Sequence, residues 1–270
     1  MALVNNERSV RQEHQQTRAG DHKGRPYGKD MMATHKEVLI PLPDRDFDTT
    51  EVSIPWKTCV EADLKVTFST ETGHIAQTDP RLLTGVIFGQ LGARPEAIAA
   101  YRALEKDEAF RHPIPYESID PQRYDLLLLP GGHAKGMRQY LESKVVQNKA
   151  LEFMKQNKVV GAICHGVLVL ARTINPETGR SVLYGRKLTG LTKGLERAGY
   201  YLTFWRLGDY YRTYPEYVED ETVSMLKDRS DFLHGGSIRK PFVVEDGNLI
   251  TARYPADAQL FAQKLVDKVR

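Results

Sequence analysis

The sequence predicts an α/β fold in which a doubly wound, mostly parallel sheet is sandwiched by helices. Two observations support this prediction. Short apolar runs that are typical of buried strands alternate along the chain with segments rich in helix formers. The run at 124–129 ends in four consecutive leucines, which is typical of a parallel strand with both faces buried.

The predicted elements follow from these patterns in chain order. Strands are expected at 37–41, 64–69, 124–129 and 159–163, with a short one at 185–190 and a pair around the Asp246-Gly247 turn over 242–251. Helices are expected from residue 51 to about residue 60 with Thr49 or Thr50 as cap, at 144–156, from residue 166 onward, and at 256–269.

Composition and charge limit the classes of function. With 270 residues and 41% hydrophobic residues, the chain can build a full core, and we expect one domain over 35–270 after a flexible polar arm at 1–34. A net charge of +3 implies neither a nucleic-acid partner nor a membrane surface. Two cysteines form no disulfide scaffold and no zinc pair, so we expect a reducing cytoplasmic setting.

Cys164 lies at the join of a predicted strand and a predicted helix. The small residues Ala162 and Gly166 flank it and let the two backbones approach closely, as in the nucleophile elbow of hydrolases. The start of a helix also favours negative charge, so we expect a lowered thiol pKa and a nucleophilic Cys164. The alternative is a buried structural cysteine, which is a common fate of free thiols.

Other candidate site residues follow the carboxyl ends of predicted strands, where open α/β sheets build their active sites. Glu51 comes after the first strand, and Glu196 follows the predicted strand at 185–190. Gly131 and Gly132 follow the leucine-rich strand and are candidates for half of an oxyanion hole, with the amide of His165 as the other half. The next residue, His133, is a candidate for substrate binding.

The stretch 200–217 is unusually aromatic. Aromatic residues at this density more often pack an interface or a core than line a ligand pocket. We therefore expect a dimer or lid surface here, with a ligand pocket as the alternative.

Four segments together give the chain a resemblance to a known group of proteins. They are Asp48-Thr49-Thr50-Glu51 followed by Pro55-Trp56, Leu129-Pro130-Gly131-Gly132-His133-Ala134, Ala162-Ile163-Cys164-His165-Gly166, and Val244-Glu245-Asp246-Gly247-Asn248-Leu249-Ile250-Thr251. In these segments the chain resembles the ThiJ/PfpI superfamily over residues 37–270. That resemblance implies a flavodoxin-like fold of the class I glutamine amidotransferase type.

The resemblance also implies roles for site residues. Cys164 would be the nucleophile, Glu51 would hydrogen-bond its thiolate, and His165 would lie beside it. In the heat-shock-protein-like branch, which includes glutathione-independent glyoxalases, an acidic residue orients the histidine, and Glu196 is the nearest match. Superfamily members commonly form homodimers, and the chemistry needs no metal and no cofactor.

Two departures bear on the substrate. True amidotransferases need a His-x-Glu pair near the C-terminus, and residues 250–260 contain none, which argues against glutamine hydrolysis. Glyoxalase-like members usually carry a Gly-Gln-Asn-Pro-like segment where this chain has Ala252-Arg253-Tyr254-Pro255.

Three hypotheses about function remain open at this point. The leading one is a glutathione-independent, glyoxalase-like enzyme that converts a small carbonyl such as methylglyoxal to lactate through Cys164. The second is a cysteine hydrolase of amides or small peptides, which would use the same oxyanion hole. The third is a non-catalytic stress protein in which Cys164 senses oxidation or the aromatic surface acts as a chaperone.

Overall fold

The computed structural model describes residues 35–270, so the arm expected at 1–34 lies outside the described residues. Seven strands form one sheet in the order β10-β11-β7-β6-β1-β3-β5, and all neighbouring pairs are parallel except β10 with β11. This is the doubly wound, mostly parallel sheet that the sequence predicts. Its strands are β1 (Glu37–Pro41), β3 (Lys65–Thr70), β5 (Ile114–Pro115), β6 (Leu126–Leu129), β7 (Val159–Ile163), β10 (Val243–Asp246) and β11 (Leu249–Ala252).

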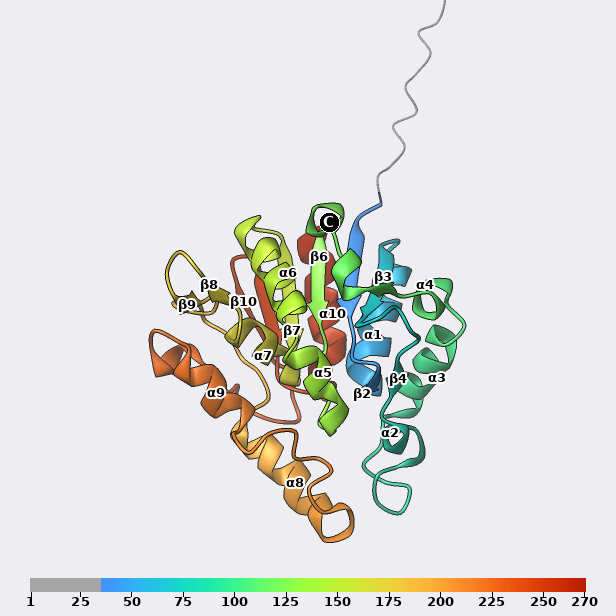
Figure 1. Ribbon diagram of the computed structural model, residues 1–270. Helices are drawn as coiled ribbons and strands as arrows, with labels where there is room; N and C mark the ends of the chain where they lie inside the picture. The colour runs from blue at the N-terminus through green and yellow to red at the C-terminus, as the bar shows by residue number, and fades with distance from the viewer. Residues whose placement is uncertain (1–34) are drawn as a thin grey trace, which may run out of the picture. The chain divides into compact units, whose positions relative to one another are not determined.

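Helices cover both faces of this sheet (Figure 1). On one face α1 (Thr49–Glu61) packs against α10 (Ala258–Val269), and on the other α6 (Lys144–Lys155) packs against α7 (Val167–Ala171). None of the described helices is long and apolar enough to cross a membrane. The remaining helices are α2 (Pro80–Thr84), α3 (Pro95–Leu104), α4 (Glu108–Arg111), α5 (Arg138–Leu141), α8 (Lys193–Leu207) and α9 (Val218–Ser224). Short strands outside the main sheet pair β2 (Arg45–Phe47) with β4 (Gln77–Thr78), and β8 (Ile174–Asn175) with β9 (Arg180–Ser181).

The strand order reverses direction between β1 and β6. The chain leaves β1 through α1 toward β3, whereas it leaves β6 through α6 toward β7 on the opposite side. Right-handed crossovers then place the two helices on opposite faces and open a crevice at the carboxyl ends of β1 and β6. In open α/β sheets ligands bind at this switch point, so the loops after β1 and β6 are the first place to look for a site.

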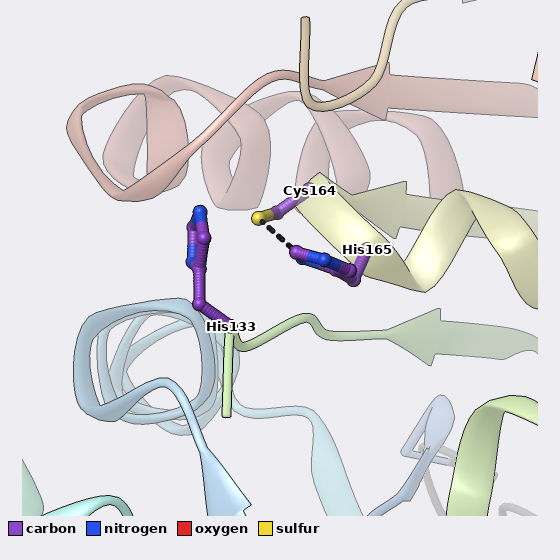
Figure 2. Close-up of side chains that lie close together, drawn as sticks. All are labelled: His133, Cys164 and His165. Atoms are coloured by element: carbon purple, nitrogen blue, oxygen red, sulfur yellow. Dashed lines mark hydrogen bonds between the residues drawn. The ribbon is translucent and has the colours of Figure 1, made fainter. Parts of the chain in front are cut away.

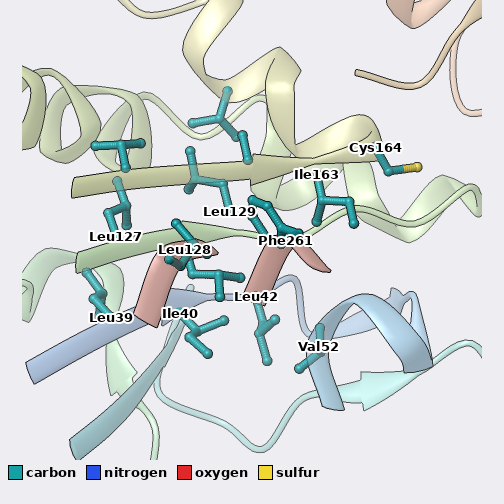
Figure 3. Close-up of a cluster of buried hydrophobic side chains, with 14 of the residues drawn as sticks. Leu39, Ile40, Leu42, Val52, Leu127, Leu128, Leu129, Ile163, Cys164 and Phe261 are labelled. Atoms are coloured by element: carbon teal, nitrogen blue, oxygen red, sulfur yellow. The ribbon is translucent and has the colours of Figure 1, made fainter. Parts of the chain in front are cut away.

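The central strands are buried on both faces. Leu39 of β1, Leu128 of β6 and Ile163 of β7 have no solvent exposure, and Phe261 of α10 packs into the same cluster (Figure 3). Cys164 lies at the end of this apolar row, where β7 stops. The hydrophobic core therefore packs against the turn that carries Cys164.

The short strand predicted at 185–190 is wrong. Within this segment only Leu188 forms an isolated bridge, with Phe232. The next residue, Thr189, donates its N–H to the side-chain hydroxyl of Thr251 at 2.9 Å instead of to the backbone of a neighbouring strand. The hydroxyl of Thr251 on β11 thus accepts the hydrogen bond that the backbone of a neighbouring strand would accept, and residues 185–190 form a loop.

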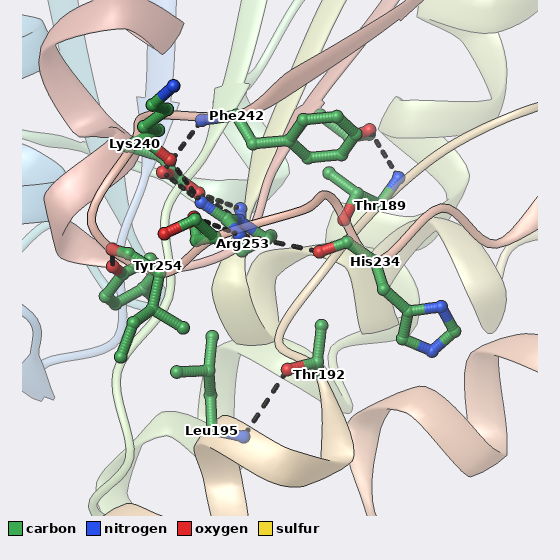
Figure 4. A network of polar contacts seen from close by, with 12 residues as sticks. Thr189, Thr192, Leu195, His234, Lys240, Phe242, Arg253 and Tyr254 are labelled. Atoms are coloured by element: carbon green, nitrogen blue, oxygen red, sulfur yellow. Dashed lines mark hydrogen bonds and ion pairs between the residues drawn. The ribbon is translucent and has the colours of Figure 1, made fainter.

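Arg253, which stands where the sequence departs from glyoxalase-like proteins, has a structural role. Its guanidinium is 2% exposed and donates to both carboxylate oxygens of Asp257, at 2.8 and 2.9 Å. The same group donates to the carbonyl oxygens of Lys240 and His234, as Figure 4 shows. This network ties the loop before β10 to the start of α10.

Gly166 allows the cysteine-bearing turn to lie against β6. A Cβ at this position would lie 2.2 Å from the carbonyl oxygen of Leu129 and 2.7 Å from that of Pro130, both of them backbone atoms. We predict that Gly166→Ala lowers the free energy of unfolding by about 3 kcal/mol, because the turn must move away from β6. Urea unfolding followed by circular dichroism measures the change.

The matched control is Gly199→Ala in α8, where a Cβ would meet no atom within 4 Å. That substitution should stabilise the helix by up to about 1 kcal/mol through helix propensity alone. Equal stability of Gly166→Ala and the wild type would contradict the close contact between the turn and β6.

Candidate active site

Glu51, Gly131 and Cys164 meet in space from three segments, namely the first turn of α1, the loop after β6 and the 3-10 turn after β7. They follow β1, β6 and β7, which are neighbours in the sheet. The N–H of Gly131 donates a 2.9 Å hydrogen bond to Oε2 of Glu51. A Cβ on Gly131 would lie 2.7 Å from that oxygen and 2.8 Å from Cβ of Cys164, so no side chain fits there. The site therefore lies at the switch point of the sheet.

Cys164 occupies a strained turn, as the elbow hypothesis requires. Its φ is 58°, in the left-handed region that a residue with a side chain rarely adopts. Strand β7 ends just before it and a 3-10 turn, Cys164–Gly166, leads into α7. Its thiol has no solvent exposure, and Sγ lies 3.6 Å from Nδ1 of His165 (Figure 2). Strain of this kind, about 1–3 kcal/mol, is typical of functional sites.

The expected low pKa of Cys164 is wrong. Burial raises the pKa of this thiol well above its usual value, and the nearby carboxyl groups of Glu51 and Asp48 raise it further. Only the backbone N–H of His165 acts in the opposite direction. Because α7 is short and starts beyond the 3-10 turn, the dipole of this helix cannot offset burial. The resting group is the thiol, and a nucleophilic thiolate requires proton transfer.

Glu51 is a buried carboxyl group whose pKa is raised. It has no solvent exposure, and burial followed by repulsion from Asp48 raises its pKa well above its usual value. Hydrogen bonds with Cys164 and Gly131 act in the opposite direction. Its second oxygen, Oε1, is buried and accepts no other hydrogen bond from the described residues. This carboxyl group can therefore donate a proton at the sulfur.

Asp48 is a site residue that the sequence reasoning missed. It replaces the expected Thr49 or Thr50 as the cap of α1, and its Oδ1 accepts hydrogen bonds from the N–H groups of Thr50 and Glu51 at 2.8 and 3.0 Å. Its own N–H donates to the carbonyl oxygen of Gly131 at 2.9 Å. The spacing Asp-x-x-Glu at 48–51 is a capping-box pattern and was the signal that could have identified it.

The hydrogen bonds of the site change which backbone amides can form the predicted oxyanion hole. The N–H of Gly131 is already bound to Glu51, so Gly131 positions the carboxyl group and its amide is not free for an oxyanion. The N–H of His165 points to the reacting sulfur, where an oxyanion on a bound substrate would form. The role of Gly132 as a second donor stays a prediction.

His165 and His133 are uncharged rings beside the sulfur. Burial lowers the pKa of His165 well below its usual value and that of His133 to about 4. The two rings are 4.9 Å apart between centroids in an edge-to-face arrangement. Together with Cys164 they form the one group of side chains in residues 35–270 that could hold a metal ion.

Glu196 does not orient His165 by a direct hydrogen bond. Its carboxylate lies 3.3 Å from Nη1 of Arg212 and accepts the N–H of Val218 at 2.9 Å. Within residues 35–270 no hydrogen-bond partner reaches Nε2 of His165, which is buried. Glu196 instead joins α8 to the start of α9.

The aromatic stretch divides into two parts. On α8, Tyr201, Phe204 and Trp205 are about half exposed, which suits the expected surface. The following loop turns inward, where Tyr211 is buried with its ring 6.3 Å from that of His133. The hydroxyl of Tyr211 donates to Asp79 at 2.7 Å. This second part lies beside the site, and sequence density alone could not separate it from the first.

Comparisons with known proteins find relatives of this chain. A family model described as "ThiJ/PfpI family-like" matches residues 42–224, which is more than half of the chain. Glyoxalase 3 of Candida albicans is 25% identical over 148 residues, covering 55% of this chain and 59% of that protein. Glutathione-independent glyoxalase hsp3101 of Schizosaccharomyces pombe is 24% identical over 219 residues, covering 80% of this chain and 84% of that protein.

The likeness extends to solved structures. The structure of glyoxalase III from Candida albicans matches with a TM-score of 0.64 and 20% sequence identity, covering 86% of this chain and 97% of that chain. This match shows a shared fold. For the first two curated relatives, the matched region spans only 54% and 59% of their length.

The buried carboxyl group of Asp48 predicts a pH dependence of stability. Its pKa is about 6 in the folded chain against 3.8 for the free group, so the folded state binds more protons between these values. The contribution to stability is present below pH 3.8 and is lost as pH rises through about 6. The variant Asp48→Asn keeps a capping side chain. We predict that, when the pH is raised from 4 to 8, its free energy of unfolding increases by up to about 3 kcal/mol relative to that of the wild type.

Urea unfolding at the two pH values measures this difference. The matched control is Asp107→Asn at the start of α4, where a half-buried aspartate accepts the same kind of hydrogen bonds from Ala109 and Phe110. The control should change little between the two pH values. If the free energy of unfolding of Asp48→Asn changes between the two pH values as that of the wild type does, the raised pKa of Asp48 is contradicted.

Proposed function

This chain belongs to the ThiJ/PfpI family, and on that premise we propose that it is a cysteine-dependent enzyme that acts on small reactive carbonyls without glutathione. The substrate class is that of methylglyoxal, and the product is the 2-hydroxy acid lactate. One observation carries the proposal: Sγ of Cys164 lies 3.6 Å from Nδ1 of His165 and is also in contact with the buried carboxyl group of Glu51. The glyoxalase names of relatives with 20–25% identity support the same class.

The first step is addition of the sulfur to the aldehyde carbon. The thiol proton of Cys164 passes to Nδ1 of His165, which lies 3.6 Å away and is unprotonated because burial lowers its pKa. Glu51 donates its proton to the aldehyde oxygen as the carbon–sulfur bond forms. The result is a hemithioacetal, an ionised Glu51 and a protonated His165.

The next step moves hydrogen between adjacent carbons. The carboxylate of Glu51 removes the proton from the sulfur-bearing carbon while the protonated His165 donates its proton to the ketone oxygen, which gives an enediol. Glu51 then delivers its proton to the carbon that carried the ketone. The hydroxyl proton on the first carbon returns to Glu51, which leaves a lactoyl thioester on Cys164. The N–H of His165 stabilises negative charge that develops on oxygen during these transfers.

Hydrolysis completes the cycle. Water adds to the thioester carbon, the carbon–sulfur bond breaks, and His165 takes a proton from the water while it returns one to the sulfur. Lactate leaves and Cys164 is again a thiol. Methylglyoxal and one water are thus converted to lactate, with no change in the enzyme.

The hydrolase alternative is less well supported. An amide is much harder to cleave than a thioester, so an amidase depends more strongly on a complete oxyanion hole and an oriented histidine. The amide of Gly131 is bound to Glu51 and His165 has no carboxylate partner within residues 35–270. Both features weigh against an efficient amidase or peptidase.

An oxidation sensor is a second candidate, and one observation favours it. Oε1 of Glu51 is buried beside the sulfur with no other hydrogen bond from the described residues. A protonated carboxyl group in this position would donate to a sulfinate oxygen. Two molecules of peroxide would convert the thiol through sulfenic to sulfinic acid, releasing water at each step.

The test is methylglyoxal consumption with lactate detection in the absence of glutathione. We predict turnover by the wild type and loss to the uncatalysed background in Cys164→Ala, because the carbon–sulfur bond cannot form. Cys59→Ala is the matched control, since Cys59 is the other free cysteine and is buried in α1. It should keep wild-type turnover.

Two other outcomes are informative. Retained activity in Cys164→Ala would refute the covalent route. Absence of turnover in the wild type, together with sulfinic acid at Cys164 after mild peroxide, would replace the enzyme with the oxidation sensor.

A further inference from the structure

A cluster of three metal-binding side chains surrounds the sulfur. The ligand atoms of His133, Cys164 and His165 all lie within 4.8 Å of one another, and Figure 2 shows the sulfur between the two rings. We propose that this cluster is a binding site for a divalent zinc ion, which holds Cys164 as a metal-bound thiolate. The proposal does not depend on the carbonyl chemistry proposed above.

The spacing of the cluster suits tetrahedral coordination. With zinc–sulfur and zinc–nitrogen bonds of about 2.3 and 2.0–2.1 Å, a tetrahedron places sulfur and nitrogen about 3.6 Å apart. The distance from Sγ of Cys164 to Nδ1 of His165 is 3.6 Å. The ligand nitrogen of His133 lies within 4.8 Å of the other two ligand atoms, so the site needs a shift of this side chain to reach the same spacing. Three protein ligands leave the fourth position for water.

The ring of His133 is able to make this adjustment. Its backbone is fixed, because Thr213 donates a 2.6 Å hydrogen bond to the carbonyl oxygen of His133. The side chain is only partly buried, unlike those of Cys164 and His165, and its ring makes edge contacts with its aromatic neighbours. Side-chain rotation therefore needs no movement of β6.

The surroundings of the cluster favour a cation. The buried acids Asp48 and Glu51 take part in none of the ion pairs formed by the described residues. A divalent ion would add positive charge where a thiolate at Cys164 forms next to these two carboxyl groups.

Metal binding has a chemical consequence for Cys164. Its S–H proton would leave on coordination, and the sulfur lone pair would be held by the metal. A sulfur bound in this way neither adds to a carbonyl nor reacts readily with peroxide. Zinc would thus be a reversible blocker of the nucleophile, in competition with substrate.

Cobalt(II) titration of the full, reduced chain tests the site directly, because cobalt reports tetrahedral thiolate coordination by its absorption. We expect one equivalent of cobalt per chain to produce a thiolate-to-metal charge-transfer band, and one equivalent of zinc to abolish it. Cys164→Ala should lose the band, and Cys59→Ala should keep it. This readout does not require enzymatic turnover.

The histidine ligand is tested by His133→Asn, with His133→Gln as a second variant that keeps more side-chain volume. Each should weaken zinc affinity, measured by competition with cobalt, by at least about tenfold. The matched control is His74→Asn, since His74 lies in an exposed loop and contacts only Thr72 through its ring. Circular dichroism confirms that each variant is folded.

Three results would overturn the proposal. The first is a wild type that gives no charge-transfer band. The second is a band that survives in Cys164→Ala, which would place the metal elsewhere. The third is unchanged affinity in both folded His133 variants, which would remove His133 from the site.

Discussion

The site depends on one electrostatic constraint: three acidic groups are buried together with no cation beside them. Asp48, Glu51 and the thiol of Cys164 are almost free of solvent exposure and form no ion pair with any described residue. Ionisation of one group makes ionisation of the other two less favourable, so at most one of the three groups ionises readily near neutral pH. At rest these groups therefore favour their protonated forms, and Cys164 becomes a nucleophile only when its thiol proton is removed.

The fold imposes this constraint through backbone contacts. Asp48 and Glu51 occupy the first turn after β1, where the amide of Gly131 clamps Glu51 from the loop after β6. Close contact between Gly166 and β6 holds the left-handed turn at Cys164. Glu51 lies in the first turn of α1 and Cys164 in the turn after β7, and both side chains are fully buried there. The same arrangement would serve the proposed proton transfer to a carbonyl and the proposed coordination of a metal, since both begin with removal of the thiol proton.

Sequence patterns predicted the sheet well because buried parallel strands are apolar along their whole length, as in the leucines of β6. They failed at 185–190, where the side chain of Thr251 supplies the acceptor that a neighbouring strand would supply. At the site, local signals pointed to Cys164 and Glu51, which the fold brings together, and their catalytic roles stay predictions. The thiol pKa was predicted in the wrong direction because burial and charges from another loop decide it, and these are not visible in local sequence. Glu196 was misassigned for the same reason, since its partner Arg212 lies beyond α8.

The central claim is that Glu51 carries a proton while Cys164 is a thiol. The most direct measurement is an infrared difference spectrum of the wild type minus Glu51→Gln at neutral pH, recorded in water and in heavy water. We predict the carbonyl stretch of a protonated carboxylic acid, shifted by deuterium and belonging to Glu51 alone. A difference spectrum that contains only carboxylate bands would show that Glu51 is ionised at rest and would contradict the account.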